Sequence, residues 1–398
     1  MNGMDWIEGE LDELRSKGLF RQLRDLESPQ EARATFDGRE VVNLSSNNYL
    51  GLTTHPRLIS AALEATERYG AGSGSVRTIA GTMTLHEELE RRLAEFKHTE
   101  AALVFQSGFT CNSGIIPVLA GEGDVILSDE LNHASIIDGI RMTRAERKIF
   151  PHKDMNALED ALKTAGNARR RLVITDGVFS MDGDVAPLPD IVDLAERYDA
   201  MVYVDDAHAS GVFGRNGRGT VDHFGLNGRV HVQVGTLSKA IGVLGGYVAS
   251  TQGLRDLLVH RGRPFLFSTS HPPAVAAACI AAIDVLENEP ERIERLWDNT
   301  RFLKAGFQNL GLNTGESESP ITPVIVGGGR KAMRLSDRLF EEGVFAQGIG
   351  YPTVPEAKSR VRTIVTSEHT HDDLKEALDA LERVGRELGI VEQGVVTA

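Results

Sequence analysis

Residues 235–246 read Gly-Thr-Leu-Ser-Lys-Ala-Ile-Gly-Val-Leu-Gly-Gly, and they place Lys239 just after an apolar run that is typical of a buried strand. Glycines and small apolar residues follow the lysine, without further charge. A long cation at the end of a buried strand is costly unless it meets an anion or loses its charge in a covalent bond. We therefore predict that Lys239 is a Schiff-base lysine.

The overall charge of the chain argues against two classes of partner. The 398 residues include 43 Lys and Arg and 57 Asp and Glu, for a formal net charge of −14. That excess of acidic charge opposes non-specific binding to nucleic acid and to anionic membranes. The longest apolar run, residues 274–286, is shorter than the roughly 20 residues that a membrane span needs, so it is predicted to be a buried helix. We expect a partner of neither kind.

The N-terminus and the cysteines point to a cytoplasmic protein. Residues 1–6 lack the apolar core of a signal peptide. Cys111 and Cys279 cannot form a disulfide scaffold, and buried thiols in a reducing compartment are the simpler interpretation. The 12 histidines show no metal-binding spacing, and no metal is expected.

Residues 85–250 alternate helical patterns with short apolar runs rich in β-branched residues. This alternation predicts an α/β fold with a largely parallel sheet. The predicted strands are residues 101–105, 125–127, 172–175, 201–204, 230–234 and 246–249.

The chain after residue 289 has a different texture. Helical patterns there surround two strand-like runs, residues 321–326 and 361–365, which favours a smaller α+β domain. We divide the chain into an N-terminal arm (1–50), a large domain (51–288) and a small C-terminal domain (289–398).

Polar side chains follow several of the predicted strands, where ligand-binding residues of parallel α/β sheets collect. Asp205 comes directly after one strand, with His208 three positions on, and Lys239 follows the next strand. A carboxylate in this place can keep a pyridine nitrogen protonated, which makes pyridoxal phosphate an electron sink. Alone, Asp205 could equally be a helix cap or a salt-bridge partner. Its convergence with Lys239 favours the cofactor role.

Hydroxyl groups near the same strand ends could hold a phosphate. Thr236 and Ser238 flank the lysine, Ser180 follows another strand, and Gly108 and Phe109 follow a third. Hydroxyls and backbone N–H groups at the start of a loop or helix can bind a phosphate dianion. Each residue could instead be an ordinary cap or turn former.

His133 and Arg362 are further candidates. His133 lies in a segment too polar for a core strand, and its imidazole could stack on a flat heteroaromatic ring, although a structural role is the default for a lone histidine. Arg362 alternates with apolar residues in a predicted strand. It could be a solvated cation, or it could grip a carboxylate if it faces a cleft.

Four motifs together make the chain resemble the α-oxoamine synthases, a family of pyridoxal-phosphate enzymes. The resemblance extends from residue 44 to residue 371 and implies the aspartate-aminotransferase fold, also called fold type I. The motifs are Gly-Thr-Leu-Ser-Lys239-Ala, Asp205-Asp-Ala-His208, Asp129-Glu-Leu-Asn-His133-Ala-Ser and Asn47-Asn-Tyr-Leu-Gly-Leu.

The resemblance implies a role for each candidate. Lys239 would bind the cofactor and move protons, and Asp205 would pair with the pyridine nitrogen. His208 would bond the ring 3-oxygen, and His133 would stack on the ring. The residues implied to hold other cofactor oxygens and the phosphate are Ser107, Gly108, Phe109, Ser180, Thr236, Ser268 and Thr269, the last two reaching the other subunit of a homodimer with shared active sites. Asn47 and Arg362 would hold the carboxylate of an amino acid.

The implied reaction joins an amino acid to an acyl-CoA, with Lys239 as the base. Within the family the chain resembles glycine C-acetyltransferase most, on the strength of residues 105–109, residues 360–363 and its length. We therefore expect glycine and acetyl-CoA as substrates. A non-catalytic relative of the family is disfavoured, because Lys239 is present.

The main alternative is 8-amino-7-oxononanoate synthase of biotin synthesis, which uses alanine and a pimeloyl thioester, or an enzyme that accepts both pairs. That enzyme often carries an arginine just before Pro-Thr-Val-Pro, whereas this chain has Tyr351 there. The departure favours a small acyl group, although Arg21 or Arg263 could reach a distal carboxylate.

Overall fold

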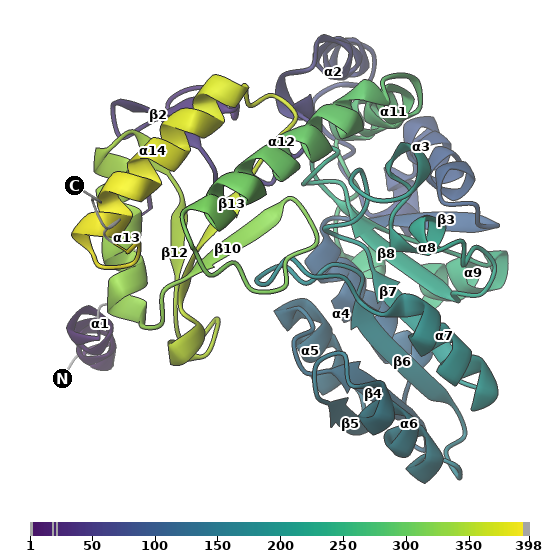
Figure 1. The fold of residues 1–398 in the computed structure, drawn as a ribbon. Helices are drawn as coiled ribbons and strands as arrows, with labels where there is room; N and C mark the ends of the chain where they lie inside the picture. The colour runs from purple at the N-terminus through teal and green to yellow at the C-terminus, as the bar shows by residue number, and fades with distance from the viewer. Residues whose placement is uncertain (1–2, 18–19, 21–22, 393–398) are drawn as a thin grey trace, which may run out of the picture.

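The computed structural model describes residues 3–17, 20 and 23–392. Its centre is a seven-stranded sheet in the order β3-β9-β8-β7-β6-β4-β5 (Figure 1). Strand β9 runs antiparallel to the other six strands of this sheet, which are parallel to one another. The expectation of an α/β fold with a largely parallel sheet is therefore confirmed. The strands are β3 (Ala101–Phe105), β4 (Val125–Asp129), β5 (Glu146–Phe150), β6 (Arg171–Asp176), β7 (Met201–Asp205), β8 (Val232–Thr236) and β9 (Gly246–Ser250).

Helices cover both faces of this sheet, because successive strand residues point to opposite faces and both sets are apolar. In β6, Val173 packs in one buried cluster, while Leu172 and Ile174 pack in another. The helices of this region are α2 (Pro56–Tyr69), α3 (Thr84–Phe96), α4 (Gly108–Leu119), α5 (Ala134–Arg141), α6 (Met155–Thr164), α7 (Leu188–Arg197), α8 (Thr220–His223), α9 (Gln252–Arg261), α10 (Arg263–Phe267) and α11 (Pro273–Asn288).

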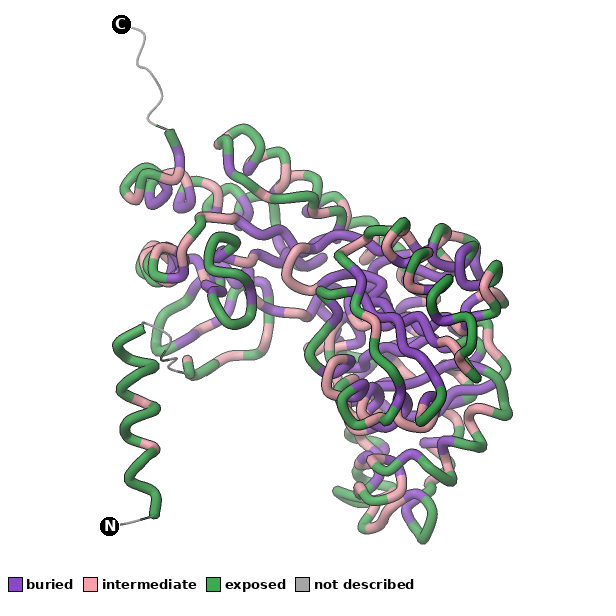
Figure 2. Tube along the Cα trace, turned by 90° about the horizontal axis from the view of Figure 1, so that it is seen from below, coloured by how far each residue is buried: buried purple, intermediate pink, exposed green. Residues whose placement is uncertain are grey.

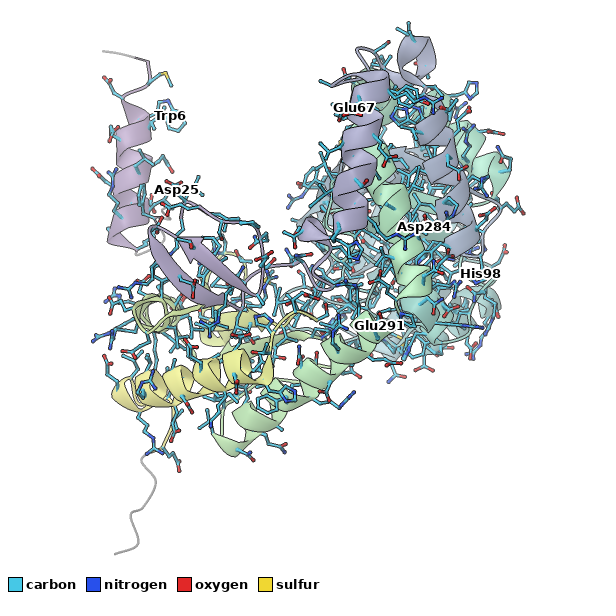
Figure 3. All side chains as sticks on the ribbon, turned by 90° about the horizontal axis from the view of Figure 1, so that it is seen from above. Trp6, Asp25, Glu67, His98, Asp284 and Glu291 are labelled. Atoms are coloured by element: carbon cyan, nitrogen blue, oxygen red, sulfur yellow. The ribbon has the colours of Figure 1, made fainter. Side chains whose placement is uncertain are left out.

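The apolar run at residues 274–286 forms most of α11, which is buried as the sequence predicts. It packs along α2, and Figure 3 shows the two helices side by side, with Glu67 labelled on α2 and Asp284 on α11. No helix in the described part of the chain has the length and hydropathy of a membrane span.

The C-terminal part contains two small sheets. One is antiparallel, in the order β10-β13-β12, and the other has the order β1-β2-β11. Its elements are α12 (Glu291–Asn309), β10 (Ile321–Ile325), α13 (Gly329–Glu341), β11 (Val344–Phe345), β12 (Gln347–Ile349), β13 (Arg360–Ile364) and α14 (His371–Glu387).

The N-terminal strands belong in space to this C-terminal part. Strand β2 (Arg39–Asn43) pairs with β1 (Arg33–Phe36) and, in parallel, with β11. The preceding helix α1 (Trp6–Ser16) has no buried residue, and Figure 2 shows it standing apart from the body of the molecule. The division into three domains stays a prediction, with β1 and β2 attached to the last of them.

Candidate active site

The carboxyl ends of three neighbouring strands form the floor of the candidate site. Asp176 at the end of β6 is in register with Asp205 at the end of β7, and Asp205 is in register with Val234 of β8. Lys239 follows β8 after a two-residue connection. The structure thus brings Asp205 and Lys239 to one edge of the sheet, as the parallel order requires.

The Asp205 carboxylate is held at both oxygens. Oδ1 accepts a hydrogen bond from the backbone N–H of Ala207 at 3.0 Å, and Oδ2 accepts one from Asn112 Nδ2 at 2.7 Å. Asn112 also donates to Ser135 Oγ at 2.8 Å and accepts from the Tyr203 hydroxyl at 2.5 Å. These contacts fix the carboxylate in one orientation.

Asn112 is a site residue that the sequence analysis missed. It is fully buried in α4, a helix that is otherwise largely apolar. A buried polar residue needs partners for its donors and acceptor. A lone asparagine among apolar helix residues was therefore the signal that could have found it.

The same hydrogen-bond network connects His133 to Asp205. It caps α5, its backbone N–H donates to Asp176 Oδ2 at 2.9 Å, and its Nδ1 is 2.7 Å from Ser135 Oγ. Burial lowers the pKa of His133, an effect that the Asp205 charge opposes. The ring is therefore neutral near neutral pH, which suits stacking on another ring.

Asp176 is the second residue that the sequence analysis missed. Its side chain is buried, and burial together with the nearby Asp205 charge raises its pKa well above the ordinary value. Two carboxyl groups at adjacent strand ends repel as anions, so one of them keeps a proton more readily. The site therefore combines a carboxylate with a carboxyl group that resists ionisation.

The Lys239 amine has the properties that a Schiff-base lysine needs. Burial lowers its pKa to about 8, although the charges of Asp205 and Asp176 act in the opposite direction. A buried lysine with a lowered pKa has a substantial neutral fraction near neutral pH, and only the neutral amine is a nucleophile or a base.

His208 is the second histidine of the candidate site. Its Nδ1 is 2.8 Å from the Tyr49 hydroxyl. Burial, helped by the positive charges of Lys239 and Arg362, lowers the pKa of His208 well below its usual value. A neutral ring that is fixed by Tyr49 can take part in hydrogen bonds without adding charge to the site.

The start of α4 offers a phosphate site. Ser107 caps the helix, and its Oγ accepts from the backbone N–H of Thr110 at 3.1 Å. Gly108 lies against Thr236, whose Oγ1 donates to Gly245 O at 2.9 Å and is 2.7 Å from Ser238 Oγ. Hydroxyls and a helix N-terminus therefore meet where the sequence predicts, and Phe109 is half exposed beside them.

The segment of Ser268 and Thr269 lies next to this turn of its own chain. Gln106 Nε2 donates to Thr269 O at 2.8 Å, and Thr269 forms an isolated bridge with Val76. The Oε1 atom of Gln106 is buried and finds no hydrogen-bond partner in the described part of the chain. The contact of Ser268 and Thr269 with another subunit stays a prediction.

We call Asn47, Arg362 and the Ser180 loop that Arg362 contacts the rim of the candidate site. Arg362 Nη1 donates to the carbonyl oxygen of Ser180 at 2.9 Å, so β13 touches the loop after β6. Asn47 Oδ1 is buried but has no hydrogen-bond partner among the described residues. Arg21 lies outside the described residues, and the Arg263 guanidinium lies over the Phe267 ring, 5.4 Å from its centroid.

These groups fit pyridoxal phosphate. Asp205 matches a protonated pyridine nitrogen, neutral imidazoles flank the place of a ring, and the Lys239 amine matches an aldehyde. The start of α4 matches a phosphate dianion. Buried polar atoms are normally paired, so the unpaired Asn47 and Gln106 oxygens are consistent with a site that is completed by a ligand.

Comparison with known proteins supports this interpretation of the site. The family model of class I and II aminotransferases matches residues 39–381. The 8-amino-7-oxononanoate synthase of Symbiobacterium thermophilum is 67% identical over 97% of this chain and 99% of its own length. The 8-amino-7-oxononanoate synthase 1 of Bacillus subtilis is 59% identical over 97% and 99%.

Solved structures agree on the fold. A serine palmitoyltransferase from S. paucimobilis with bound PLP-myriocin aldimine matches with a TM-score of 0.93 at 33% identity, covering 98% of each chain. The 8-amino-7-oxononanoate synthase of Francisella tularensis matches with a TM-score of 0.75 at 27% identity, covering 87% of this chain and 98% of its own. The fold is fold type I, and the cofactor is pyridoxal phosphate.

The expectation of glycine C-acetyltransferase activity is wrong. The relatives with 55–67% identity over nearly the whole chain are named 8-amino-7-oxononanoate synthase. The expectation rested on residues 105–109, residues 360–363 and the chain length, and the missing arginine at Tyr351, a residue that is 60% exposed, favoured a small acyl group. One position in an exposed loop does not define an acyl pocket, because cations from other segments can hold a distal carboxylate.

Proposed function

The chain belongs to the class I and II aminotransferase family, and on that premise we propose that it is an 8-amino-7-oxononanoate synthase. It would condense alanine with a pimeloyl thioester, with loss of carbon dioxide, in biotin synthesis. The observation that carries this proposal is the 67% identity with the Symbiobacterium thermophilum enzyme over 97% of the chain. Two chains that are this similar over nearly their whole length are expected to share the fold and the site residues, which supports a common function.

The cofactor supplies an electron sink for the negative charge that develops on the α-carbon of the amino acid. The residues of the chain would supply the rest. Asp205 would hold the proton at the pyridine nitrogen, and Asn112 would keep the carboxylate in place. His133 would flank one face of the ring, and Thr236 with the start of α4 would hold the phosphate.

Proton movement would depend on Lys239. Its amine would take the α-proton of alanine, since a lowered pKa of about 8 leaves it partly neutral near neutral pH. After the carbon–carbon bond has formed and carbon dioxide has left, the same amine would return a proton to that carbon. Arg362 and Asn47 would orient alanine through its carboxylate until that group is lost.

The test is a comparison of four substrate pairs with purified holoenzyme: alanine or glycine with a pimeloyl or an acetyl thioester. Free thiol gives the rate, mass spectrometry gives the product, and alanine labelled in its carboxyl group gives the carbon dioxide released. We expect kcat/KM for alanine with the pimeloyl thioester to exceed the other three by about 100-fold. Higher efficiency with another pair would overturn the proposal.

The proposed assembly is a symmetric homodimer. Large apolar side chains are exposed beside the proposed site, with Phe267 71%, Leu244 49% and Phe109 48% exposed. Burial of such a surface against a second copy would stabilise the dimer. Light scattering should give twice the mass of the 43.3-kDa chain, and a fully active monomer would contradict this assembly.

A further inference from the structure

A cluster of charged side chains lies outside the groups assigned above. His152, in the loop after β5, is placed between two carboxylates of other loops. Its Nδ1 is 3.0 Å from Asp129 Oδ1, and its Nε2 is 2.8 Å from Asp184 Oδ2. The ring also packs edge-on against Phe179, with centroids 4.4 Å apart. Both ring nitrogens are therefore used to join segments that are distant in the sequence.

Each carboxylate belongs to a loop that carries a proposed site residue. Asp129 ends β4, and its Oδ1 accepts from the backbone N–H of Leu131 at 2.9 Å, in the turn that leads to His133. Asp184 closes the turn that contains Ser180, since its carbonyl oxygen accepts from the backbone N–H of Phe179 at 3.0 Å. His152 thus contacts both loops through their carboxylates.

We propose that His152 is a positioning residue of the active site, which joins the loop of His133 to the loop of Ser180 through its two ring nitrogens. It touches neither reacting atoms nor cofactor. The inference rests on the proposed roles of His133 and Ser180 at the cofactor, and it is independent of the substrates.

The charges around His152 favour its protonated form. Burial alone would lower its pKa, but the hydrogen bonds and charges of Asp129 and Asp184 raise the pKa to about 9. The two carboxylates are only 3% and 5% exposed, so each needs a cationic partner. Glu130 also faces His152, because its Oε1 accepts from the His152 backbone N–H at 2.9 Å.

Lys153 provides a matched control beside His152. Its Nζ is 3.1 Å from Asp184 Oδ2 and 3.6 Å from Glu318 Oε2, while its side chain makes no contact with Asp129. Lys153 therefore shares in neutralising Asp184, whereas only the His152 side chain spans Asp129 and Asp184. Replacing each side chain in turn therefore distinguishes the effect of the bridge between Asp129 and Asp184 from the effect of a positive charge beside Asp184.

The bridge has a defined pH window. The folded-state pKa of His152 lies above its ordinary value of 6.5, so its contribution is complete below about 6.5 and is lost as the pH rises through about 9. As the pH rises through that window, the wild-type protein should come to behave like a variant that lacks the protonated His152 ring.

The experiment measures the dissociation constant of pyridoxal phosphate from the full chain as a function of pH, for wild type, His152→Gln and Lys153→Gln. We expect His152→Gln to weaken binding about tenfold at neutral pH, the effect of one lost charged hydrogen bond, and Lys153→Gln to weaken it less than about threefold. The ratio between His152→Gln and wild type should fall towards one as the pH rises through about 9.

Two results would overturn the inference: unchanged cofactor affinity in His152→Gln, or an equal loss in Lys153→Gln. If His152→Gln does not fold, amide exchange of residues 177–185 in wild-type holoenzyme gives the answer. After correction for the intrinsic exchange rate, exchange must quicken as the pH rises through about 9, and a constant protection would overturn the inference. An enzyme that shows the bridge but rejects alanine with a pimeloyl thioester would contradict only the proposed function.

Discussion

The floor and the rim of the site differ in how completely their polar groups are paired. In the floor, Asn112 uses both amide protons and its oxygen, and Asp205 is bound at both carboxylate oxygens. In the rim, Asn47 Oδ1 has no partner among the described residues, and Arg362 donates to a backbone carbonyl. In the proposed site the floor would be preorganised for the cofactor, and a substrate would complete the rim.

This difference explains why the family could be recognised and the substrates could not. Three residues of the proposed site, Asp205, His208 and Lys239, follow directly after strands and lie in short motifs, so the sequence indicates them. The rim gathers Asn47, Ser180 and Arg362 from three distant segments. The preference of the rim for one substrate depends on how those segments are arranged in space, so a single motif does not predict it.

The largest effect should come from Lys239, which belongs to neither region's hydrogen-bond network but serves both. Lys239→Ala should lower kcat by at least roughly 1000-fold, because the base and the covalent anchor are lost together. Steady-state thiol release measures this, with the exposed Lys375→Ala as control. Activity within tenfold of wild type would show that another group moves the proton.

A smaller effect is expected from the floor. Asn112→Ala leaves Asp205 Oδ2 and the Tyr203 hydroxyl without their partner in a buried place, at a cost of about 1.5–3 kcal/mol. Cofactor affinity and thermal stability should therefore fall together. Titration of the apoprotein and a melting curve measure both, with the exposed Asn309→Ala as control. Loss of neither would show that the floor is not held by Asn112.

The rim should respond in KM rather than in cofactor binding. Arg362→Lys keeps the charge but loses the planar fork, so we expect KM for alanine to rise about tenfold with little change in cofactor affinity. Initial rates at varied alanine concentration provide the measurement. A rise in KM for the thioester alone would move Arg362 from the amino-acid side to the acyl side.

The smallest effect should be on stability in the rim. Asn47→Ala removes an oxygen that has no hydrogen-bond partner, so the free energy of unfolding should change by less than about 0.5 kcal/mol while KM for alanine rises. Denaturant unfolding checks the first part and initial rates the second. Destabilisation as large as that of Asn112→Ala would show that the floor and the rim do not differ in how their polar groups are paired.

The elements predicted from the sequence were those with a local signal. Most strands of the large sheet are short apolar runs, and β3, β4, β6, β7, β8 and β9 were located within a few residues. Strand β5 was missed, since it lies at the edge of the sheet and most of Glu146–Phe150 is exposed or half exposed. The pairing of β2 with β11 joins residues about 300 positions apart, and no local pattern predicts it.

The same distinction holds for the site. Asp205, His208 and Lys239 were identified from their places after strands, whereas Asn112 and Asp176 gain their roles only from contacts across the sheet. The substrates were predicted wrongly because the inference relied on short motifs at residues 105–109 and 360–363, on the chain length and on one exposed residue, Tyr351. Physical reasoning from the sequence therefore predicted the cofactor but not the acyl chain of the substrate.

The central claim is that this chain binds pyridoxal phosphate covalently through Lys239 on a preorganised floor. Borohydride reduction of the holoenzyme, followed by peptide mapping, tests this most directly. We predict that the reduced cofactor is found on the peptide that contains Lys239 and on no other lysine. A label on a different lysine, or no label in protein that contains the cofactor, would contradict the account.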